Sequence, residues 1–414
     1  MIDFKPFKAI RPVADKVHLV ASRSYVSYAR KALASKLDEN PYTFIHIINP
    51  EYNKPGRKSS GLTKFRKVRE RFLDFVSEGV YFQDQTDCFY LYRQVQQIPG
   101  GKTFTGWIGG ASVQDYLNKK IKIHEHTITS REEMFRQYLE VTGFNAEPVL
   151  IAHPHSEDLL ALRDEIIQST PSYDFTSTNR DRHQLWKVSD PKEIQAIQTY
   201  FSEFDASYIA DGHHRSASSV LLAQDKIDNP SAQHFLACFI DEAEMAIYDF
   251  NRLIKDAGGL SSEILIKLIV ENQIDLTPCE LETPLEPGSF KLYTPEGWYL
   301  GKFPEDTLGK RNPVEALEAH QLSEFVLGPI FDIIDLRTDK RVFFKGGRSG
   351  HIGLQNSVDK GEADFAFALP AVTIEDLKRV ADAGLCMPPK STYIEPKLRS
   401  GMTIYPIEKN LVSG

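Results

Sequence analysis

Residues 211–216 read Asp-Gly-His-His-Arg-Ser and follow an apolar run, 207–211, that is typical of a short strand. A segment with helical spacing, 214–223, comes next. If both elements form, Gly212 occupies the tight turn and lets a ligand approach the backbone, because glycine has no Cβ. The unpaired N–H groups at the start of the helix then converge with the positive end of its dipole, which favours an anion. The pattern predicts a phosphate-binding turn.

The side chains of this turn fit the same chemistry. Arg215 can bind phosphate through two N–H groups at once, and His213 or His214 can supply a proton or a further donor. Ser216 lies in the first turn of the expected helix. The alternative is a solvated turn in which Asp211 caps the helix. Two histidines and an arginine are more than capping requires.

A second candidate is the segment 121–133, which begins Ile-Lys-Ile-His-Glu-His. If it begins as a strand, His124 and His126 share one face and Glu125 points to the other. This alternation suits a pair of metal ligands, or one catalytic carboxylate flanked by donors. An exposed edge whose histidines are satisfied by hydrogen bonds explains the pattern equally well.

A third candidate is the irregular segment 384–402, where paired prolines end the preceding helix. Five of its side chains suit an anionic ligand: Lys390, Ser391, Thr392, Lys397 and Arg399. The alternative is a surface tail with solvated charges. A weaker candidate is Asn251 in the stretch Asp-Phe-Asn-Arg-Leu, which a strand end with polar caps also explains.

The elements that position these residues form a mixture of strands and helices. Short β-prone runs occupy 42–48, 146–153 and 207–211. Capping pairs mark helix starts at Ser130, Asp190 and Thr373. A stretch rich in glycine and serine, 255–263, predicts a boundary, after which 290–294 and 298–303 read as a β-hairpin. The sequence predicts an α+β protein with two domains, 1–255 and 256–414, the second contributing the basic segment to the site.

The overall composition argues against several classes of protein. The net charge of −8 does not favour binding to nucleic acid or to an anionic membrane, because both are negatively charged. The four cysteines are widely scattered and are expected to be reduced. The first residues lack the apolar core of a signal peptide, and the richest apolar run is too short to span a bilayer. A soluble cytoplasmic protein is expected.

Five stretches in order, "IHEHT", "IADGHHRSAS", "YDFNRLI", "TDKRVFF" and "MPPKSTYIEPKLRSGM", resemble the bacterial and archaeal family labelled domain of unknown function 1015. The Asp-Gly-His-His-Arg turn is also similar to the glycine and arginine box of the ParB and sulfiredoxin superfamily, especially that of the archaeal ADP-dependent free serine kinases. This resemblance implies a ParB/sulfiredoxin-like N-terminal part of mixed sheet and helices, followed by a smaller α+β C-terminal part. It also implies that Gly212, His213, His214 and Arg215 bind phosphate, with Asp211 close by.

One segment departs from the family. Its members tend to carry Pro-Pro-Tyr-Asp-Val near the N-terminus, whereas this chain has "ASRSYVSYAR" at 21–30. Tyr25 matches, but Val26 or Ser27 replaces the acidic residue. Arg23 adds a cation that suits a phosphate.

These observations predict a small-molecule phosphoryl-transfer enzyme, with serine or phosphoserine as the leading substrate and the direction, kinase or phosphatase, left open. The cations of the turn and of 384–402 would neutralise the phosphoryl oxygens. Glu125 or Asp211 would orient or deprotonate the attacking group, and His214 would protonate the leaving oxygen. Mg²⁺ is expected if ADP or ATP takes part.

Two alternatives stay open. In a metal-dependent hydrolase, His124, His126, His213 and His214 would hold a transition metal. A ParB-like adaptor would instead bind a nucleotide without turnover. The first hypothesis requires that the three motif regions meet in one site.

Overall fold

The structure is a computed structural model that describes residues 1–24, 28, 30–52, 58–304, 311–346 and 350–412. Of the segment that departs from the family, Tyr25, Val26 and Ser27 lie outside the described residues. The described chain is α+β, as predicted, with helices and mixed sheets. It divides into two compact units: unit 1 is Met1–Lys122, Thr127–Met245 and Pro396–Gly414, and unit 2 is Ile123–His126 and Ala246–Glu395.

These units are interleaved along the chain, whereas the stretches 1–255 and 256–414 predicted from composition are continuous. Ile123–His126 joins unit 2, where the carbonyl of His124 accepts a hydrogen bond from the backbone N–H of Met387 at 2.8 Å. Pro396–Gly414 returns to unit 1. Such long-range returns leave no mark in local composition, so a boundary read from glycine and serine alone misses them.

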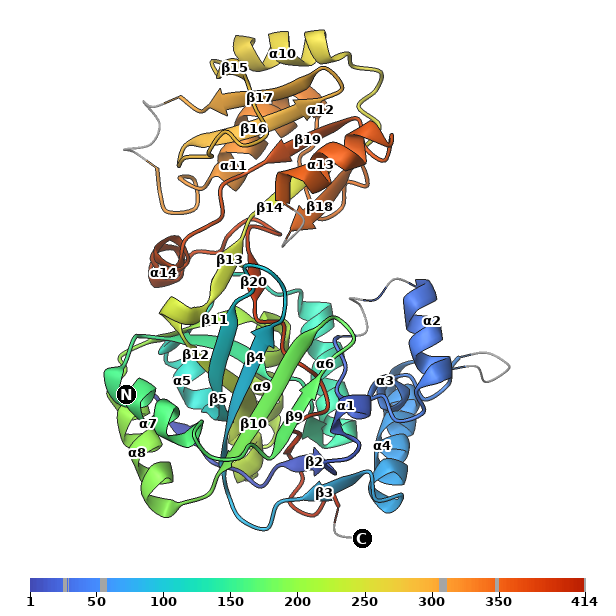
Figure 1. The fold of residues 1–414 in the computed structure, drawn as a ribbon, viewed down its shortest axis with the longest axis vertical. Helices are drawn as coiled ribbons and strands as arrows, with labels where there is room; N and C mark the ends of the chain where they lie inside the picture. Colours follow the sequence, from blue (N-terminus) through green and yellow to red (C-terminus); the bar gives the residue numbers. More distant parts are fainter. Residues whose placement is uncertain (25–27, 29, 53–57, 305–310, 347–349, 413–414) are drawn as a thin grey trace. The chain divides into compact units, whose positions relative to one another are not determined.

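Unit 1 is built around a nine-stranded mixed sheet (Figure 1). Its path, in spatial order, is β6 (Ile121–Lys122), β11 (Ser207–Asp211), β8 (Val149–His153), β12 (His234–Asp241), β5 (Thr103–Ser112), β4 (Phe89–Gln96), β10 (Asp181–Val188) and β9 (Tyr173–Thr176), with β1 (Phe4–Lys5) paired to β5. The pairs β6–β11 and β8–β12 are parallel, and the others are antiparallel. Two small antiparallel pairs accompany it: β2 (Ile10–Pro12) with β3 (Tyr81–Gln83), and β7 (Phe144–Asn145) with β21 (Tyr405–Pro406).

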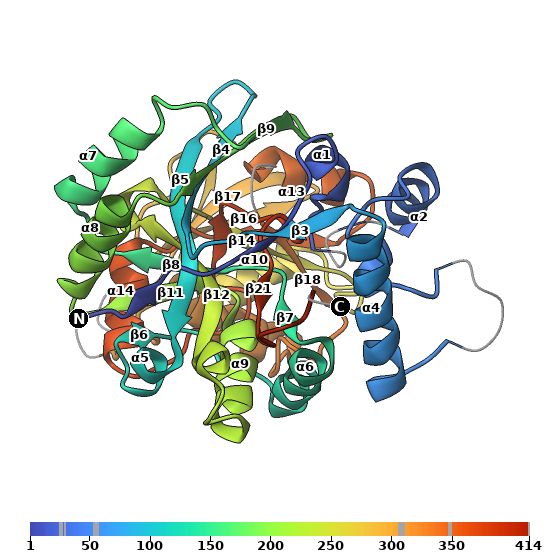
Figure 2. The same ribbon diagram turned by 90° about the horizontal axis from the view of Figure 1, so that it is seen from below.

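The helices of unit 1 cover both faces of this sheet. They are α1 (Val17–Val20), α2 (Arg30–Glu39), α3 (Ile45–Ile48), α4 (Gly61–Ser77), α5 (Val113–Leu117), α6 (Thr129–Thr142), α7 (Glu157–Ile166), α8 (Pro191–Ser202) and α9 (His213–Asp225). Side chains of β12 alternate between the faces: Phe239 contacts Phe201 of α8, while Cys238 packs in a cluster with Leu222 of α9. Helices α6 and α9 lie side by side (Figure 2).

Unit 2 contains a six-stranded antiparallel sheet. Its spatial order is β15 (Asp275–Cys279), β17 (Gly297–Lys302), β16 (Ser289–Thr294), β19 (Phe365–Ala368), β14 (Phe250–Ile254) and β18 (Val342–Gly346); β13 (Ala246–Tyr248) pairs separately with β20 (Tyr393–Glu395). Its helices are α10 (Ser262–Glu271), α11 (Glu318–Leu322), α12 (Gly328–Phe331), α13 (Gly350–Asp359) and α14 (Ile374–Asp382), with a π-helical turn at Ser323–Leu327 between α11 and α12. The predicted hairpin at 290–303 is therefore confirmed as β16 and β17.

Several predicted local features form and two do not. Asp190 caps α8, and Thr373 with Asp376 forms the capping box of α14. The run 42–48 forms no strand, because Ile45–Ile48 is the short helix α3; a short apolar run does not distinguish the two by periodicity. Ser130 is not a cap, since α6 begins one residue earlier, at Thr129.

Two further observations concern the described residues. None of their helices has the length and apolar content needed to cross a bilayer. All four cysteines are free thiols, two of them buried.

Candidate functional site

The turn at 211–216 has the predicted strand-to-helix geometry. Strand β11 ends at Asp211 and α9 begins at His213. Gly212, between them, has φ of 103° and ψ of 28°, a conformation that side chains with a Cβ rarely adopt. Among the described residues no side chain caps α9. The alternative in which Asp211 caps the helix therefore does not hold. The carbonyl of Gly212 accepts from the backbone N–H groups of Arg215 and Ser216 at 2.9 Å and 3.0 Å, as the first turn of a helix requires.

Asp211 instead organises two cations. Its Oδ2 accepts from Nη2 of Arg215 at 2.6 Å, and its Oδ1 accepts from Nζ of Lys397 at 3.1 Å. Burial disfavours the charged carboxylate, but Lys397 and Arg215 outweigh it and lower the pKa of Asp211 to about 2. Asp211 is thus ionised at neutral pH and is a weak base. Its geometry suits holding the two cations in place better than taking up a proton.

Arg215 is also bound on its other side. Its Nη1 lies 3.1 Å from Oε1 of Glu147 and donates to the carbonyl of Pro148. A Cβ on Gly212 would lie 2.9 Å from the Arg215 guanidinium. The missing Cβ of Gly212 therefore makes room for Arg215, whereas the sequence predicts that a ligand uses this space. Both terminal nitrogens of Arg215 already contact protein acceptors.

The two histidines differ in their surroundings. His213 is buried and His214 half-buried. Burial, and then the charge of Arg131, lower the pKa of His214, while Glu132 acts in the opposite direction. In the described part of the chain, Nδ1 of His214 is buried and has no hydrogen-bond partner. His214 is therefore neutral at pH 7, which suits a proton acceptor better than the proton donor that the sequence predicted. The buried hydroxyl of Ser216 donates to the carbonyl of His213 at 2.9 Å and so serves the helix itself.

The segment that carries Lys397 continues into a buried polar cluster of unit 1. Nη2 of Arg399 donates to Oγ of Ser177 at 3.1 Å and to Oδ1 of Asn179 at 2.6 Å, and it lies 3.6 Å from Oδ2 of Asp181. His183 is beside them, with its Nε2 3.1 Å from Oγ of Ser177. Burial, and then the charge of Arg399, lower the pKa of His183 to about 3, so this histidine is neutral. Unit 1 therefore holds Lys397 and Arg399 of the third motif together with the Asp211 turn.

The histidines of the second motif belong to unit 2, because Ile123–His126 lies there while the rest of 121–133 lies in unit 1. Strand β6 ends at Lys122, so His124 and His126 do not share a strand face as predicted. His124 is buried, whereas Glu125 and His126 are exposed. No group of three or more histidine, cysteine, aspartate or glutamate side chains in the described ranges is placed to hold a metal ion. The structure gives no support to the metal site predicted from four histidines.

The other predicted residues of unit 2 make local contacts. Ser391 donates from Oγ to the carbonyl of Pro388 at 2.8 Å. Nζ of Lys390 lies 5.6 Å from the ring centre of Phe250. Oδ1 of Asn251 accepts from the backbone N–H of Leu369 at 2.9 Å, which fits the polar strand residue of the alternative explanation.

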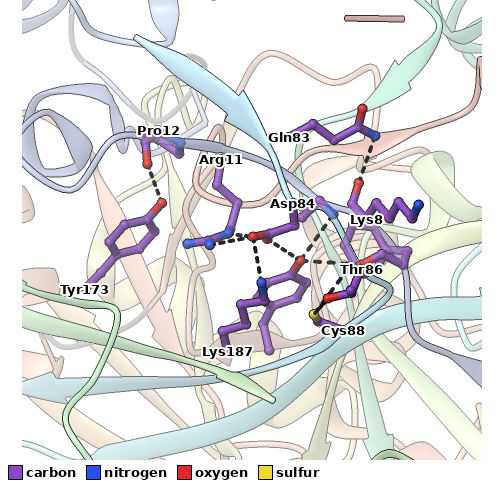
Figure 3. A network of polar contacts seen from close by, with 12 residues as sticks. Lys8, Arg11, Pro12, Gln83, Asp84, Thr86, Cys88, Tyr173 and Lys187 are labelled. Atoms are coloured by element: carbon purple, nitrogen blue, oxygen red, sulfur yellow. Dashed lines mark hydrogen bonds and ion pairs between the residues drawn. The ribbon is translucent and has the colours of Figure 1, made fainter. Parts of the chain in front are cut away.

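Sequence reasoning missed a buried ionic network in unit 1 (Figure 3). Asp84 accepts from Nε of Arg11 at 2.6 Å and from the hydroxyl of Tyr90 at 2.7 Å, and Nζ of Lys187 lies 3.1 Å away. Arg11 and Asp84 are 73 residues apart in sequence, so no local spacing could have revealed the pair. Because the network is satisfied internally, we assign it to holding β2 and β3 against the sheet.

The comparison with known families adds to this geometry. The family described as "Protein of unknown function (DUF1015)" matches residues 4–320. The chain belongs to this family. No curated protein matches it.

Several solved structures of low similarity resemble this family member. A free serine kinase in complex with AMP is 15% identical, with 69% of this chain and 88% of that chain covered and a TM-score of 0.35. A variant of free serine kinase in complex with ADP is 15% identical, with coverage of 69% and 89% and a TM-score of 0.37. SbnI from Staphylococcus aureus, with a C-terminal truncation, is 13% identical, with coverage of 73% and 90% and a TM-score of 0.39. With TM-scores below 0.5, these similarities carry no conclusion about function.

Proposed function

We propose that unit 1 binds the phosphate of a small metabolite or nucleotide at the start of α9 and transfers a phosphoryl group there. The observation that carries this proposal is a helix that begins at a left-handed glycine, without a side-chain cap, beside Lys397. Uncapped N–H groups at the positive end of the helix dipole bind phosphate. Serine or phosphoserine is the proposed substrate, and ADP or ATP the proposed partner in transfer. A ParB/sulfiredoxin-like architecture of unit 1 belongs to the same proposal.

Different residues of unit 1 bind the phosphoryl group and accept the proton. The N–H groups of α9 and the amine of Lys397 neutralise the phosphoryl oxygens, and Asp211 fixes Lys397 and Arg215 in position. Transfer breaks the P–O bond to the donor and forms one to the attacking hydroxyl. The proton of that hydroxyl passes to the neutral His214. A role for Glu125, Lys390 and Ser391 of unit 2 stays a prediction.

Mg²⁺ fits this turn poorly as a directly bound ion. Both carboxylate oxygens of Asp211 accept from cations, and Glu147 contacts Arg215 and the hydroxyl of Ser400. Neither carboxylate offers the oxygen that Mg²⁺ prefers. No step of the proposal passes through the ion.

A second candidate is nucleotide binding without turnover. It is favoured by the pKa of about 2 at Asp211, which makes this carboxylate a weak base.

One screen separates the two candidates. Purified protein is assayed for phosphate release from phosphoserine and for ADP or ATP turnover with serine, beside Lys397→Ala and His214→Gln. Lys226→Ala is the matched control, because Lys226 lies at the other end of α9. Both site variants should lose on the order of tenfold or more in rate, and the control should not. Binding without turnover would support the second candidate, and neither binding nor turnover would refute both.

A further inference from the structure

Two arginines of unit 1 lie directly opposite each other on neighbouring segments. Ser22 and Ser400 form an antiparallel bridge, with hydrogen bonds of 3.3 Å and 2.8 Å between their backbone groups. In antiparallel pairing the residue after one partner faces the residue before the other, so Arg23 is opposite Arg399. Like charges in this position repel each other and destabilise the pairing. The chain keeps the pair despite this cost.

A third cation joins them from α2. Nζ of Lys36 lies 6.0 Å from the ring centre of Tyr28, and the hydroxyl of Tyr28 accepts a hydrogen bond from the backbone N–H of Arg23 at 3.2 Å. Burial, and then the charge of Arg399, lower the pKa of Lys36. The end of α2 is anchored near this bridge, because Nδ2 of Asn40 donates to the carbonyl of Leu19 at 2.7 Å. Arg23, Lys36 and Arg399 thus form one cluster, called the cation cluster below.

The cation cluster is not neutralised by the protein around it. Asp181 lies 3.6 Å from Arg399, and both side chains are almost fully buried, at 3% and 5% exposure. Among the residues that the structure describes, neither Arg23 nor Lys36 has a carboxylate within ion-pair distance. In addition, Nε of Arg399 is buried without a hydrogen-bond partner in the same ranges. The cluster thus has three positive charges and one carboxylate, and one buried N–H donor has no acceptor. These features are typical of a site that binds an anion.

We propose that Arg23, Lys36 and Arg399 form a second anion subsite, which binds a carboxylate or phosphate of the same small molecule whose phosphate lies at the start of α9. This inference rests on the proposed function. Arg399 is two residues from Lys397, which contacts Asp211 at that turn. The Cα atoms of residues two apart lie at most about 7 Å from each other, so Lys397 and Arg399 belong to one short stretch of unit 1. The ligand class is a small molecule with two separated anionic groups.

Calorimetric titration with two matched pairs of probes tests the subsite. Phosphoserine and phosphoethanolamine differ by one carboxylate, and ADP and AMP differ by one phosphate. The protein should bind the first member of one pair at least tenfold more tightly than the second, and the pair that does so identifies the anionic group. Arg23→Gln and Lys36→Gln should each remove on the order of tenfold of that affinity and leave the second member unchanged. Lys31→Gln, an exposed lysine of the same helix, is the control.

The other outcomes overturn the inference. The variants could weaken the affinity for both members of a pair equally, they could leave the affinity unchanged, or the protein could bind none of the probes. Arg23→Gln should not lower the melting temperature, because it removes the repulsion between Arg23 and Arg399. If this variant fails to fold, Lys36→Gln provides the same test. The titrations need no turnover, so discrimination within a pair by a protein without phosphoryl-transfer activity would refute the transfer step alone.

Discussion

Replacing Gly212 with alanine tests whether this glycine serves the backbone alone or also the position of Arg215. At φ of 103° an alanine is strained, at a cost of about 1–2 kcal/mol. Its Cβ would also lie 2.9 Å from the Arg215 guanidinium and push it from its partners. Those partners are Asp211, 39% exposed, and Glu147, 30% exposed, so each pair is worth about 1 kcal/mol or less. Gly212→Ala should therefore destabilise unit 1 by about 2–4 kcal/mol.

Gly79 supplies a matched control. It also has a positive φ, 72°, but nothing lies within 4 Å of an added Cβ. Gly79→Ala should cost only the backbone strain, about 1–2 kcal/mol. The entropy that alanine removes from the unfolded chain is common to both variants and cancels in the comparison.

The measurement is urea unfolding followed by tryptophan emission in a Trp298→Phe background. Of the three tryptophans, Trp107 and Trp186 then remain, and both belong to unit 1. Midpoints give the free energy of unfolding as long as the slope is unchanged. In an Arg215→Ala background the cost of Gly212→Ala should fall to that of Gly79→Ala, as a double-mutant cycle requires. Equal costs for the two glycines, or a Gly212 cost that Arg215→Ala does not reduce, would refute the reasoning.

Three further outcomes are expected for the stability of unit 1. Asp84→Asn should lower the free energy of urea unfolding by roughly 3–5 kcal/mol, because it leaves Arg11, 5% exposed, without its charge partner. The control Asp174→Asn breaks the exposed pair with Arg182 and should cost less than about 1 kcal/mol. Similar costs for the two variants would contradict the role given to the buried network. Burial lowers the pKa of His153 from 6.5 to about 4, so the unfolded chain binds more protons than the folded chain between these pH values. The free energy of unfolding should therefore fall as the pH drops from 6.5 towards 4, and its dependence on pH should be shallower in His153→Gln. The pKa of Asp211 lies at about 2, below the ordinary 3.8, so the stability that its ionised form contributes is present above about pH 4 and is lost as the pH falls towards 2. Asp211→Asn should therefore destabilise the protein more at about pH 7 than at about pH 3. A loss of stability that does not depend on pH would contradict the ion pairs.

The sequence was informative where structure depends on neighbours along the chain. Strand β11, the glycine turn and α9 follow directly from an apolar run, a residue without Cβ and helical spacing. The caps at Asp190 and Thr373 and the hairpin of β16 and β17 are local in the same sense. The α+β class and the family follow from such patterns and from motifs. The run 42–48 shows the limit, because a short apolar segment fits a buried helix as well as a strand.

Only the tertiary structure decided what the chemical groups face. It placed Arg215 against the carbonyl of Pro148, 67 residues away, and Lys397 against Asp211, 186 residues away. It also set Arg23 opposite Arg399 through a single bridge and assigned the His124 motif to unit 2. By itself the sequence determined which cations, carboxylates and turns the protein has. Their partners depend on packing between distant segments, because side-chain charges act through distances in space and these are not encoded by spacing along the chain.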